Sequence, residues 1–193
     1  MQELLAAGGI MLAIFLLTFG MYLLVSFILA YVFGAIGTYR LMTKRNIPNA
    51  FLAWIPIANE YALGNVYDDI VKKEKDAKDP KFRIIMLVVA LGYFVFGTRI
   101  QITIPSSVNS MTTYATSDLF SSLAGIAFIA LIVLYLICLK KIFEVYAPNN
   151  TSYFALSVVF SILFLLAPFV PALCLLKASR NDPADASKAQ PDR

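Results

Sequence analysis

Long apolar runs separated by short polar segments dominate the chain. Four of these runs are long enough for a helix that crosses a hydrocarbon core of about 30 Å, which takes about 20 residues. We predict membrane-spanning helices over about residues 10–39, 84–104, 119–139 and 153–176. In the first run, we expect Gly8-Gly9 to separate a short interfacial piece from the span.

The fourth run contains two prolines, Pro168 and Pro171. A proline inside a helix removes a hydrogen bond and kinks the axis, so the simplest interpretation is a single kinked span. The alternative is a dip that returns to the side from which it came. Its arms would have only about 15 and 6 residues, too few to cross and return, and we therefore predict the kinked span.

The segment at about residues 46–67 is apolar but broken. It begins NIPNAFLAWIPIANEYALG, so prolines interrupt it and Asn59, Glu60 and Asn65 add polar groups. A full span would place Glu60 near the membrane centre at a cost of several kcal/mol. Two interpretations stay open: an interfacial helix on the inner leaflet, or a re-entrant segment in which Asn59, Glu60 and Asn65 form a polar site between helices.

The predicted fold is thus an all-α integral membrane protein with four transmembrane helices plus this proline-broken segment. The helices form a single domain over residues 1–180, and a tail over 181–193, rich in Pro, Asp and Ala, is expected to be disordered. We expect helix contacts at small residues, among them Gly34 and Gly37 of the first span and Gly125 of the third.

Lysine and arginine predict the orientation. Residues 40–83 contain nine of them, residues 140–152 contain two, and residues 101–118 contain none. Because cytoplasmic loops carry the excess of basic residues, we predict that the N-terminus is outside and that residues 40–83 are inside. A strict count of four passes then puts the tail outside.

Composition narrows the function classes. The chain has 193 residues, of which 60% are hydrophobic and 15% charged, whereas soluble domains are about half apolar and a quarter charged. The net charge of +4 comes from basic residues that flank apolar runs, so we expect anionic lipid headgroups at the inner leaflet as partners, and no nucleic acid.

Residue types that carry catalysis or bind metals are scarce. The chain has no histidine, and its two cysteines, Cys138 and Cys174, lie in apolar runs without a CxxC spacing. We therefore predict no metal site, no cofactor and two buried free thiols. Asp68 and Asp69 suggest a divalent-metal or phosphate site as an alternative, but an acidic turn on a solvated cytosolic helix explains them more simply.

Two stretches of the chain resemble each other. In each, an apolar run ends in basic residues and is followed by a Pro-Asn pair, Pro48-Asn49 or Pro148-Asn149, then an aromatic residue and a further proline. Internal repeats are frequent in transporters, where broken helices form the substrate site. If both stretches follow a span that runs from outside to inside, the repeat is parallel. The alternative is a coincidence of residues that are common at membrane edges, which the different spacing of the prolines favours: 8 residues from Pro48 to Pro56 and 20 from Pro148 to Pro168.

The stretch IPNAFLAWIPIANEYALG also resembles a motif of small uncharacterised bacterial polytopic membrane proteins, in which an aromatic-rich segment precedes IPxxN and another aromatic residue. The resemblance covers about residues 40–67, with a weaker echo over 140–180. That family commonly has Gly-Trp where this chain has Ala50-Phe51. The resemblance implies a multi-pass protein of the bacterial cytoplasmic membrane and implies no activity.

Three function classes follow. The first hypothesis is a non-enzymatic protein: a membrane-complex partner, a protector or an envelope factor. It would bind either another membrane protein or a second copy of this chain. The alternative is a small transporter or lipid-translocating protein that uses the broken segment around Glu60. An intramembrane enzyme is disfavoured, because the chain lacks histidine and a nucleophile paired with a base.

Overall fold

The computed structural model describes residues 2–75, 80–97, 113–148, 150–163, 167 and 169–183. It describes side chains throughout these ranges except for residues 2–10, 75, 113–121 and 162. Residues 184–193 of the predicted tail and residues 98–104 of the predicted second span lie outside the described residues. All regular structure in the described part is helical, which confirms the predicted fold class at that level.

The described residues form six α-helices and one short 3-10 helix. In chain order these are α1 (Gln2–Lys44), η1 (Ala50–Trp54), α2 (Pro56–Lys75), α3 (Phe82–Gly97), α4 (Thr113–Tyr146), α5 (Thr151–Ile162) and α6 (Val170–Ala178).

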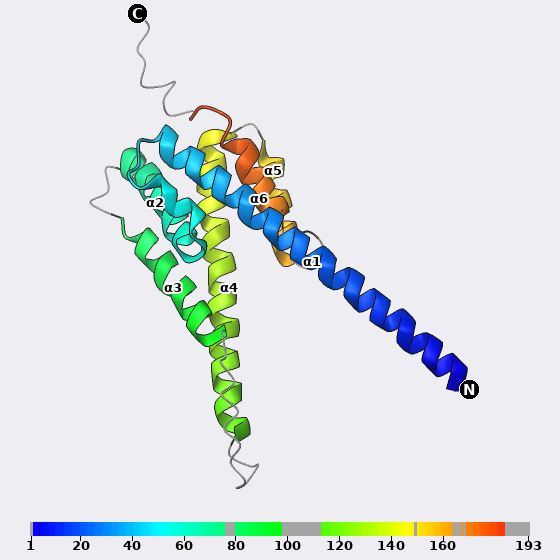
Figure 1. The fold of residues 1–193 in the computed structure, drawn as a ribbon. Coiled ribbons are helices and arrows are strands. Elements are labelled where there is room, and N and C mark those ends of the chain that lie inside the picture. Colours follow the sequence, from blue (N-terminus) through cyan, green and yellow to red (C-terminus); the bar gives the residue numbers. More distant parts are fainter. Residues whose placement is uncertain are drawn as a thin grey trace, which may run out of the picture.

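Two helices, α1 over Met11–Lys44 and α4 over Ser122–Tyr146, are long and apolar enough to cross a membrane. They run in the same direction and converge toward the end where they finish (Figure 1), and α2 and α6 each contact both of them. The helix α3 is apolar over 16 residues and runs the opposite way beside α4. By length and composition, the structure thus supports two of the four predicted spans and indicates a membrane-associated protein.

The helix α1 is longer than predicted. It continues through Gly8-Gly9, where we expected a break, and has 43 residues. A glycine inside a helix costs only about 1 kcal/mol relative to alanine, and the neighbouring leucines and alanines favour the helix. The prediction of a separate interfacial piece before residue 10 is therefore wrong.

We call the end at which α1, α4 and α6 finish the basic end, because basic side chains gather there. They are those of Lys44, Arg45, Lys141, Lys177 and Arg180.

The segment that follows α1 turns back along it and then returns, and we call residues 46–75 the first hairpin. Asn46 and Asn49 have φ values of 56° and 61°, a left-handed conformation that asparagine tolerates better than most residues. The Tyr31 hydroxyl of α1 donates a hydrogen bond to the Trp54 carbonyl oxygen. Because Tyr31 lies 13 residues before Lys44, Trp54 lies about 20 Å from the basic end.

The helix α2 brings the first hairpin back to the basic end. The break predicted from the prolines is confirmed, because η1 ends at Trp54 and α2 begins at Pro56, a position where the missing N–H costs no helical hydrogen bond. At the far end of α2, Lys141 Nζ of α4 lies 2.6 Å from Glu74 Oε2.

A second hairpin, residues 150–178, follows α4. The prediction of one kinked span over 153–176 is wrong, because α5 ends at Ile162 and α6 begins only at Val170. After α6 the chain is again at the basic end, where Asn181 Nδ2 donates to the Tyr146 carbonyl oxygen at 2.8 Å. The helix α5 has 12 residues, about 18 Å, which is too short to cross a hydrocarbon core.

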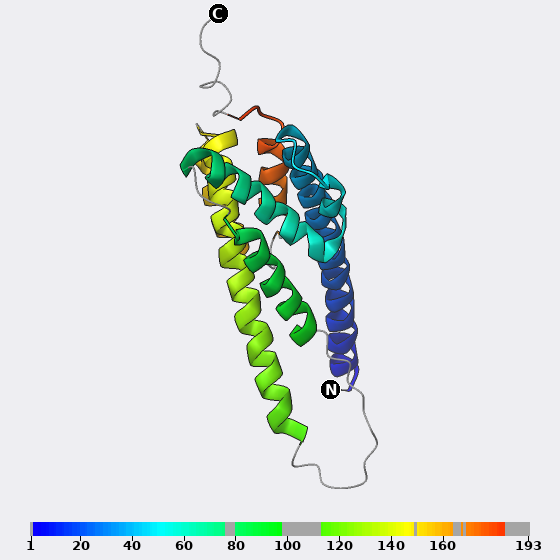
Figure 2. The same cartoon turned by 90° about the vertical axis from the view of Figure 1, so that its left-hand side faces the viewer.

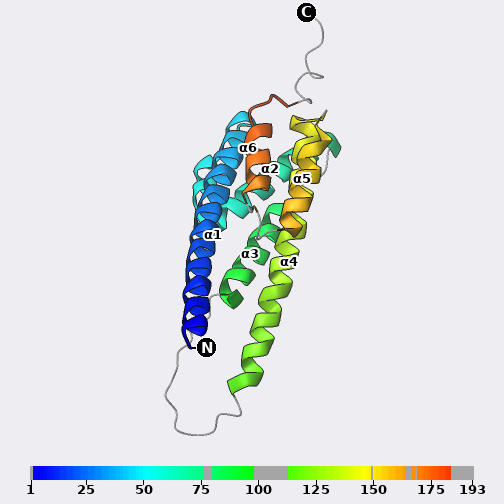
Figure 3. The same ribbon diagram turned by 90° about the vertical axis from the view of Figure 1, so that its right-hand side faces the viewer.

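The two hairpins lie on opposite sides of the α1–α4 pair. Figure 2 shows α2 in front, and Figure 3, from the opposite direction, shows α6 in front. Each of α2 and α6 contacts both α1 and α4. The buried core lies at the basic end and includes Leu41, Ile70, Ile142 and Leu175.

Small residues allow two close helix contacts. A Cβ added to Gly37 of α1 would lie 3.1 to 3.3 Å from atoms of Leu175 and Leu176 in α6, and one added to Gly34 would lie 3.8 Å from Ala172 Cβ. The predicted contacts at Gly34 and Gly37 are thereby confirmed. The prediction for Gly125 of α4 is wrong, because an added Cβ there would meet no described atom within 4 Å.

Candidate functional site

A cavity of about 340 Å³ lies between the inner ends of the two hairpins. We call it the central cavity. Residues from α1, α2, α3, α4, α5 and α6 all line it. Its polar lining consists of Tyr31, Thr38, Asn59, Glu60, Tyr93, Tyr135 and Ser161. Its larger apolar lining residues are Phe27, Leu63, Phe128, Leu131, Ile132, Phe160 and Leu175.

Glu60 lines this cavity from the first turns of α2. Its side chain is surrounded by protein but keeps an intermediate exposure, as expected for a group that faces a cavity. Burial raises the pKa of Glu60 to about 7, because the carboxylate loses its water shell and gains no compensating partner among the residues that the structure describes. The described residues that line the cavity include no lysine and no arginine. The carboxyl group can therefore gain or lose a proton near neutral pH.

Asn59 supplies an unsatisfied acceptor beside Glu60. Its Oδ1 atom is buried and has no hydrogen-bond partner among the described residues. An unpaired buried amide oxygen costs about 1–3 kcal/mol, so such an atom calls for an explanation in function. Because Asn59 also lines the central cavity, a donor group inside the cavity would satisfy it.

Asn65 does not join this pair. Six residues turn a helix by about 600°, so Asn65 points about 120° away from Asn59 on α2. Its Oδ1 accepts a hydrogen bond of 3.1 Å from Arg83 at the start of α3. Of the three residues predicted to form one polar site, two lie together in the central cavity and the third lies elsewhere.

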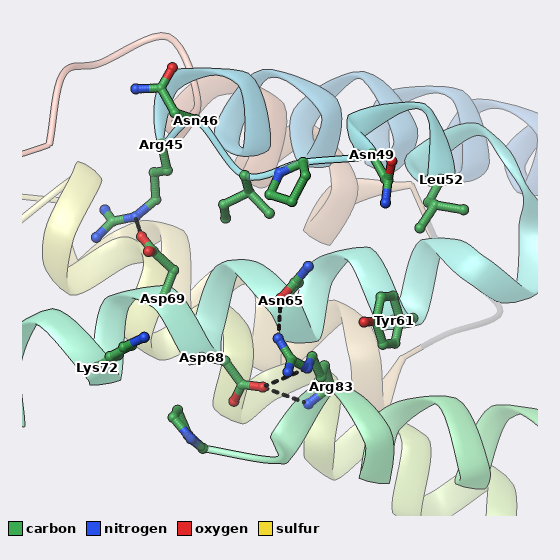
Figure 4. Close-up of a pocket in the computed structure, with 13 residues that line it drawn as sticks. Arg45, Asn46, Asn49, Leu52, Tyr61, Asn65, Asp68, Asp69, Lys72 and Arg83 are labelled. Carbon is green, nitrogen blue, oxygen red and sulfur yellow. Dashed lines mark hydrogen bonds and ion pairs between the residues drawn. The ribbon is translucent and has the colours of Figure 1, made fainter. Parts of the chain in front are cut away.

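Asn65 instead lines a second pocket of about 320 Å³, nearer the basic end, which we call the outer pocket (Figure 4). Its charged lining residues are Arg45, Asp68, Asp69, Lys72 and Arg83. Figure 4 shows these side chains coming from three places: the turn after α1, the middle of α2 and the start of α3.

The two aspartates of the outer pocket have structural partners. Asp68 is buried, and its two carboxylate oxygens accept hydrogen bonds of 3.1 Å from the backbone N–H groups of Phe82 and Arg83. These are donors that a helix leaves unpaired in its first turn, so Asp68 caps α3 from a neighbouring helix. Asp69 Oδ2 lies 2.5 Å from Arg45 Nε and 3.2 Å from Lys73 Nζ.

These contacts explain both aspartates without a metal ion or phosphate. Asp68 joins α2 to α3, and Asp69 joins α2 to the turn after α1. Arg45 also donates to the Tyr146 hydroxyl of α4 at 3.3 Å. The charged side chains of the outer pocket thus connect the first hairpin to α3, to the turn after α1 and to α4.

The cysteines are free and buried, as predicted from their apolar surroundings. Sequence reasoning missed Tyr93, Tyr135 and Ser161, which also line the central cavity. The sequence gives little indication of this role, because each is a single hydroxyl-bearing residue in an apolar helix. Such a residue more often packs against a neighbouring helix than lines a cavity. Comparison with protein-family models, with curated proteins and with solved structures finds no match to this chain.

Proposed function

We propose that this chain is a multi-pass protein of the bacterial cytoplasmic membrane that binds a small solute in the central cavity and carries it across the membrane. Glu60 is the charged centre of the site, its protonation couples transport of the solute to movement of protons, and Asn59 adds a polar contact. One observation supports this above all others: a carboxyl group in a cavity between two helical hairpins, with no basic side chain among the described lining residues.

The broken helices favour transport over a static role. Irregular backbone within a membrane is tolerated only where it packs against protein or lines a cavity, and transporters place substrate sites at such breaks near the membrane centre. The break between η1 and α2 lies at Ile55, and Pro56, Asn59 and Glu60 directly after it line the cavity. On this proposal the first hairpin is re-entrant, entering from the cytoplasmic side.

The charge distribution supports the proposed orientation. The basic end carries Lys44, Arg45, Lys141, Lys177 and Arg180, so the positive-inside rule puts it in the cytoplasm, next to anionic headgroups. The two hairpins then both enter from inside. The described start of the tail lies at the basic end, where Lys44 Nζ lies 3.3 Å from Asp182 Oδ1, so on this orientation the tail begins inside.

The hypothesis of a complex partner or protector has a weaker basis. The apolar side chains of α1 from Met11 to Ile28 are largely exposed, but lipid alone would cover such a surface. We retain from that hypothesis the prediction that the chain is not an enzyme, which rests on the lack of histidine and of a nucleophile paired with a base in the sequence.

Proteoliposomes test the proposal. Vesicles that enclose a pH indicator are given small cations, anions and neutral solutes in turn. We expect at least one solute class to change the internal pH when the wild-type protein is present, and the Glu60→Gln variant to abolish that change. The matched control is Glu144→Gln, which removes an exposed carboxylate at the basic end and should keep the flux.

Two results would overturn the proposal. One is that no solute class moves protons through the wild-type protein. The other is that Glu60→Gln supports the same flux as Glu144→Gln, since Glu60 would then have no part in transport.

A further inference from the structure

The lining of the central cavity restricts what it can bind. Aromatic rings from four helices face it: Phe27 and Tyr31 of α1, Tyr93 of α3, Phe128 and Tyr135 of α4, and Phe160 of α5. The rings of Tyr93 and Phe128 lie 5.6 Å apart between centroids. Aromatic faces attract cations, and they also bury apolar groups.

The charge of the cavity has one sign. Glu60 is the one carboxylate among the described lining residues, which include no basic side chain. The other titratable groups near it are phenols and thiols: Tyr31, Tyr93, Tyr135 and Cys138. On the α5 and α6 side, Ser161 lines the cavity and Cys174 lies near Tyr135. Phenols and thiols ordinarily ionise at about pH 10 and 8.5, so Glu60 alone changes charge near neutrality.

A charged carboxylate in such surroundings needs a counterion. An uncompensated charge in an apolar site is expensive, and the group takes up a proton unless a cation replaces it. The cavity therefore has two low-energy states, one with a protonated Glu60 and one with a cation beside the ionised Glu60.

We propose that the solute is an organic monocation with an apolar body, and that its cationic group binds at Glu60 in place of a proton. This inference rests on the proposed function and names the substrate class of the same site. When the cation enters, the proton on the Glu60 carboxyl leaves to water, and no covalent bond to carbon forms or breaks. Net charge in the cavity is unchanged by the exchange.

The same lining disfavours the other ligand classes. An anion would meet the Glu60 carboxylate and no basic partner. A bare metal ion such as Na⁺ needs several converging oxygen ligands, whereas aromatic and aliphatic side chains make up most of this lining. A volume of about 340 Å³ is at the small end of ligand pockets, which favours a compact cation with one ring or a short chain.

Binding to the purified full-length protein in detergent tests the inference. The probe is benzyltrimethylammonium, whose positive charge does not depend on pH. Its uncharged isostere is neopentylbenzene, in which carbon replaces nitrogen, and 3-phenylpropanoate is the anionic comparison. We expect the cation to bind at least about tenfold more tightly than the isostere, and the anion not to bind.

Variants at Glu60 test whether its carboxylate is responsible for the preference for the cation over the isostere. Glu60→Gln should weaken cation binding by about 10- to 100-fold, the worth of a contact with a charged group, and should leave the isostere unaffected. Retained binding of the isostere shows that the variant is folded. Glu60→Asp should keep part of the preference for the cation, and Glu144→Gln should keep all of it.

Calorimetry in two buffers of different ionisation enthalpy measures how many protons are released when the cation binds. With a pKa of about 7 for Glu60, binding at pH 6 should release close to one proton. At pH 9 the carboxyl is already ionised, so binding should release none, and affinity for the cation should rise between these two pH values.

Several outcomes would overturn the inference. They are equal binding of the cation and its isostere, cation binding that Glu60→Gln does not change, displacement of the probe by millimolar Na⁺, and no proton release at pH 6. A wild-type proton flux driven only by an anion or a neutral solute would also overturn it, but would leave the proposed transport function standing.

Discussion

Gly64 marks the closest approach of α2 to α3. A Cβ added there would lie 2.6 Å from Arg83 Cα, a distance that backbone atoms cannot accept without moving. The contact matters for the site, because it holds α3 against the hairpin that carries Asn59 and Glu60. Neighbouring Asp68 strengthens the same junction by capping α3.

Gly64→Ala should therefore destabilise the protein. We expect the free energy of unfolding to fall by about 1–3 kcal/mol, the usual cost of overpacking a close contact. The matched control is Gly125→Ala on α4, where an added Cβ has open space and the alanine should be neutral or stabilising by up to about 1 kcal/mol. Reversible unfolding in mixed micelles measures both. Equal stability of the two variants would mean that α2 and α3 do not meet at Gly64.

Single residues show how far the sequence predicts the site. Asn59 and Glu60 were predicted as polar groups in an apolar segment, because burying such groups is costly unless they bind a partner. The same reasoning wrongly added Asn65, although helical geometry alone puts it on another side of α2. Tyr93 and Tyr135 were not predicted, because a tyrosine in an apolar helix gives no sign of whether its hydroxyl faces a cavity or a neighbouring helix.

At the scale of elements, the two hairpins distinguish this fold from a simple bundle. Two features predicted the break in the first hairpin. Its prolines interrupt a helix, and a full span there would bury Glu60 without a partner. These features did not predict the second hairpin, because residues 153–176 contain no charge until Lys177 and satisfy every compositional criterion for a span. What decides the path of that segment is packing of α6 against Gly34 and Gly37 of α1, which composition does not reveal.

A disulfide tests the path of the second hairpin. In a chain with Cys138 and Cys174 replaced by alanine, Gly34→Cys and Ala172→Cys should cross-link readily under mild oxidation. The Cβ separation of 3.8 Å for this pair equals the mean of about 3.8 Å in natural disulfides. Mass spectrometry of the alkylated protein measures the yield.

The control pair is Gly20→Cys with Ala172→Cys. Gly20 lies 14 residues before Gly34 on α1, about 21 Å farther from the basic end, and should not cross-link. In a continuous span, Ala172 would instead lie near the level of Gly20. Preferential cross-linking of this control pair would therefore refute the hairpin.

At the scale of the whole molecule, the two halves follow one plan. In each, a long helix runs toward the basic end and a broken hairpin follows it: α1 with the first hairpin, and α4 with the second (Figure 1). The long helices run in the same direction, as a parallel repeat requires. The stretches after residues 40 and 140 thus each lead into a broken hairpin, although the helices of the two hairpins differ in length, and both hairpins line the central cavity.

Transport as proposed here requires Glu60 to be a protonatable carboxyl group in the central cavity, away from bulk water. The most direct measurement is residue-by-residue labelling with two carbodiimides, in membranes, read by mass spectrometry. Dicyclohexylcarbodiimide enters apolar sites and reacts with protonated carboxyl groups, whereas a water-soluble carbodiimide labels exposed ones. The exposed Glu144 serves as the internal reference.

We predict that the apolar reagent labels Glu60 in preference to Glu144, and that this labelling falls as the pH rises through about 7, the pKa of Glu60. Benzyltrimethylammonium should protect Glu60 from the reagent. Glu60 has no such environment if the water-soluble carbodiimide labels it as readily as Glu144 and its labelling does not change between pH 6 and pH 9.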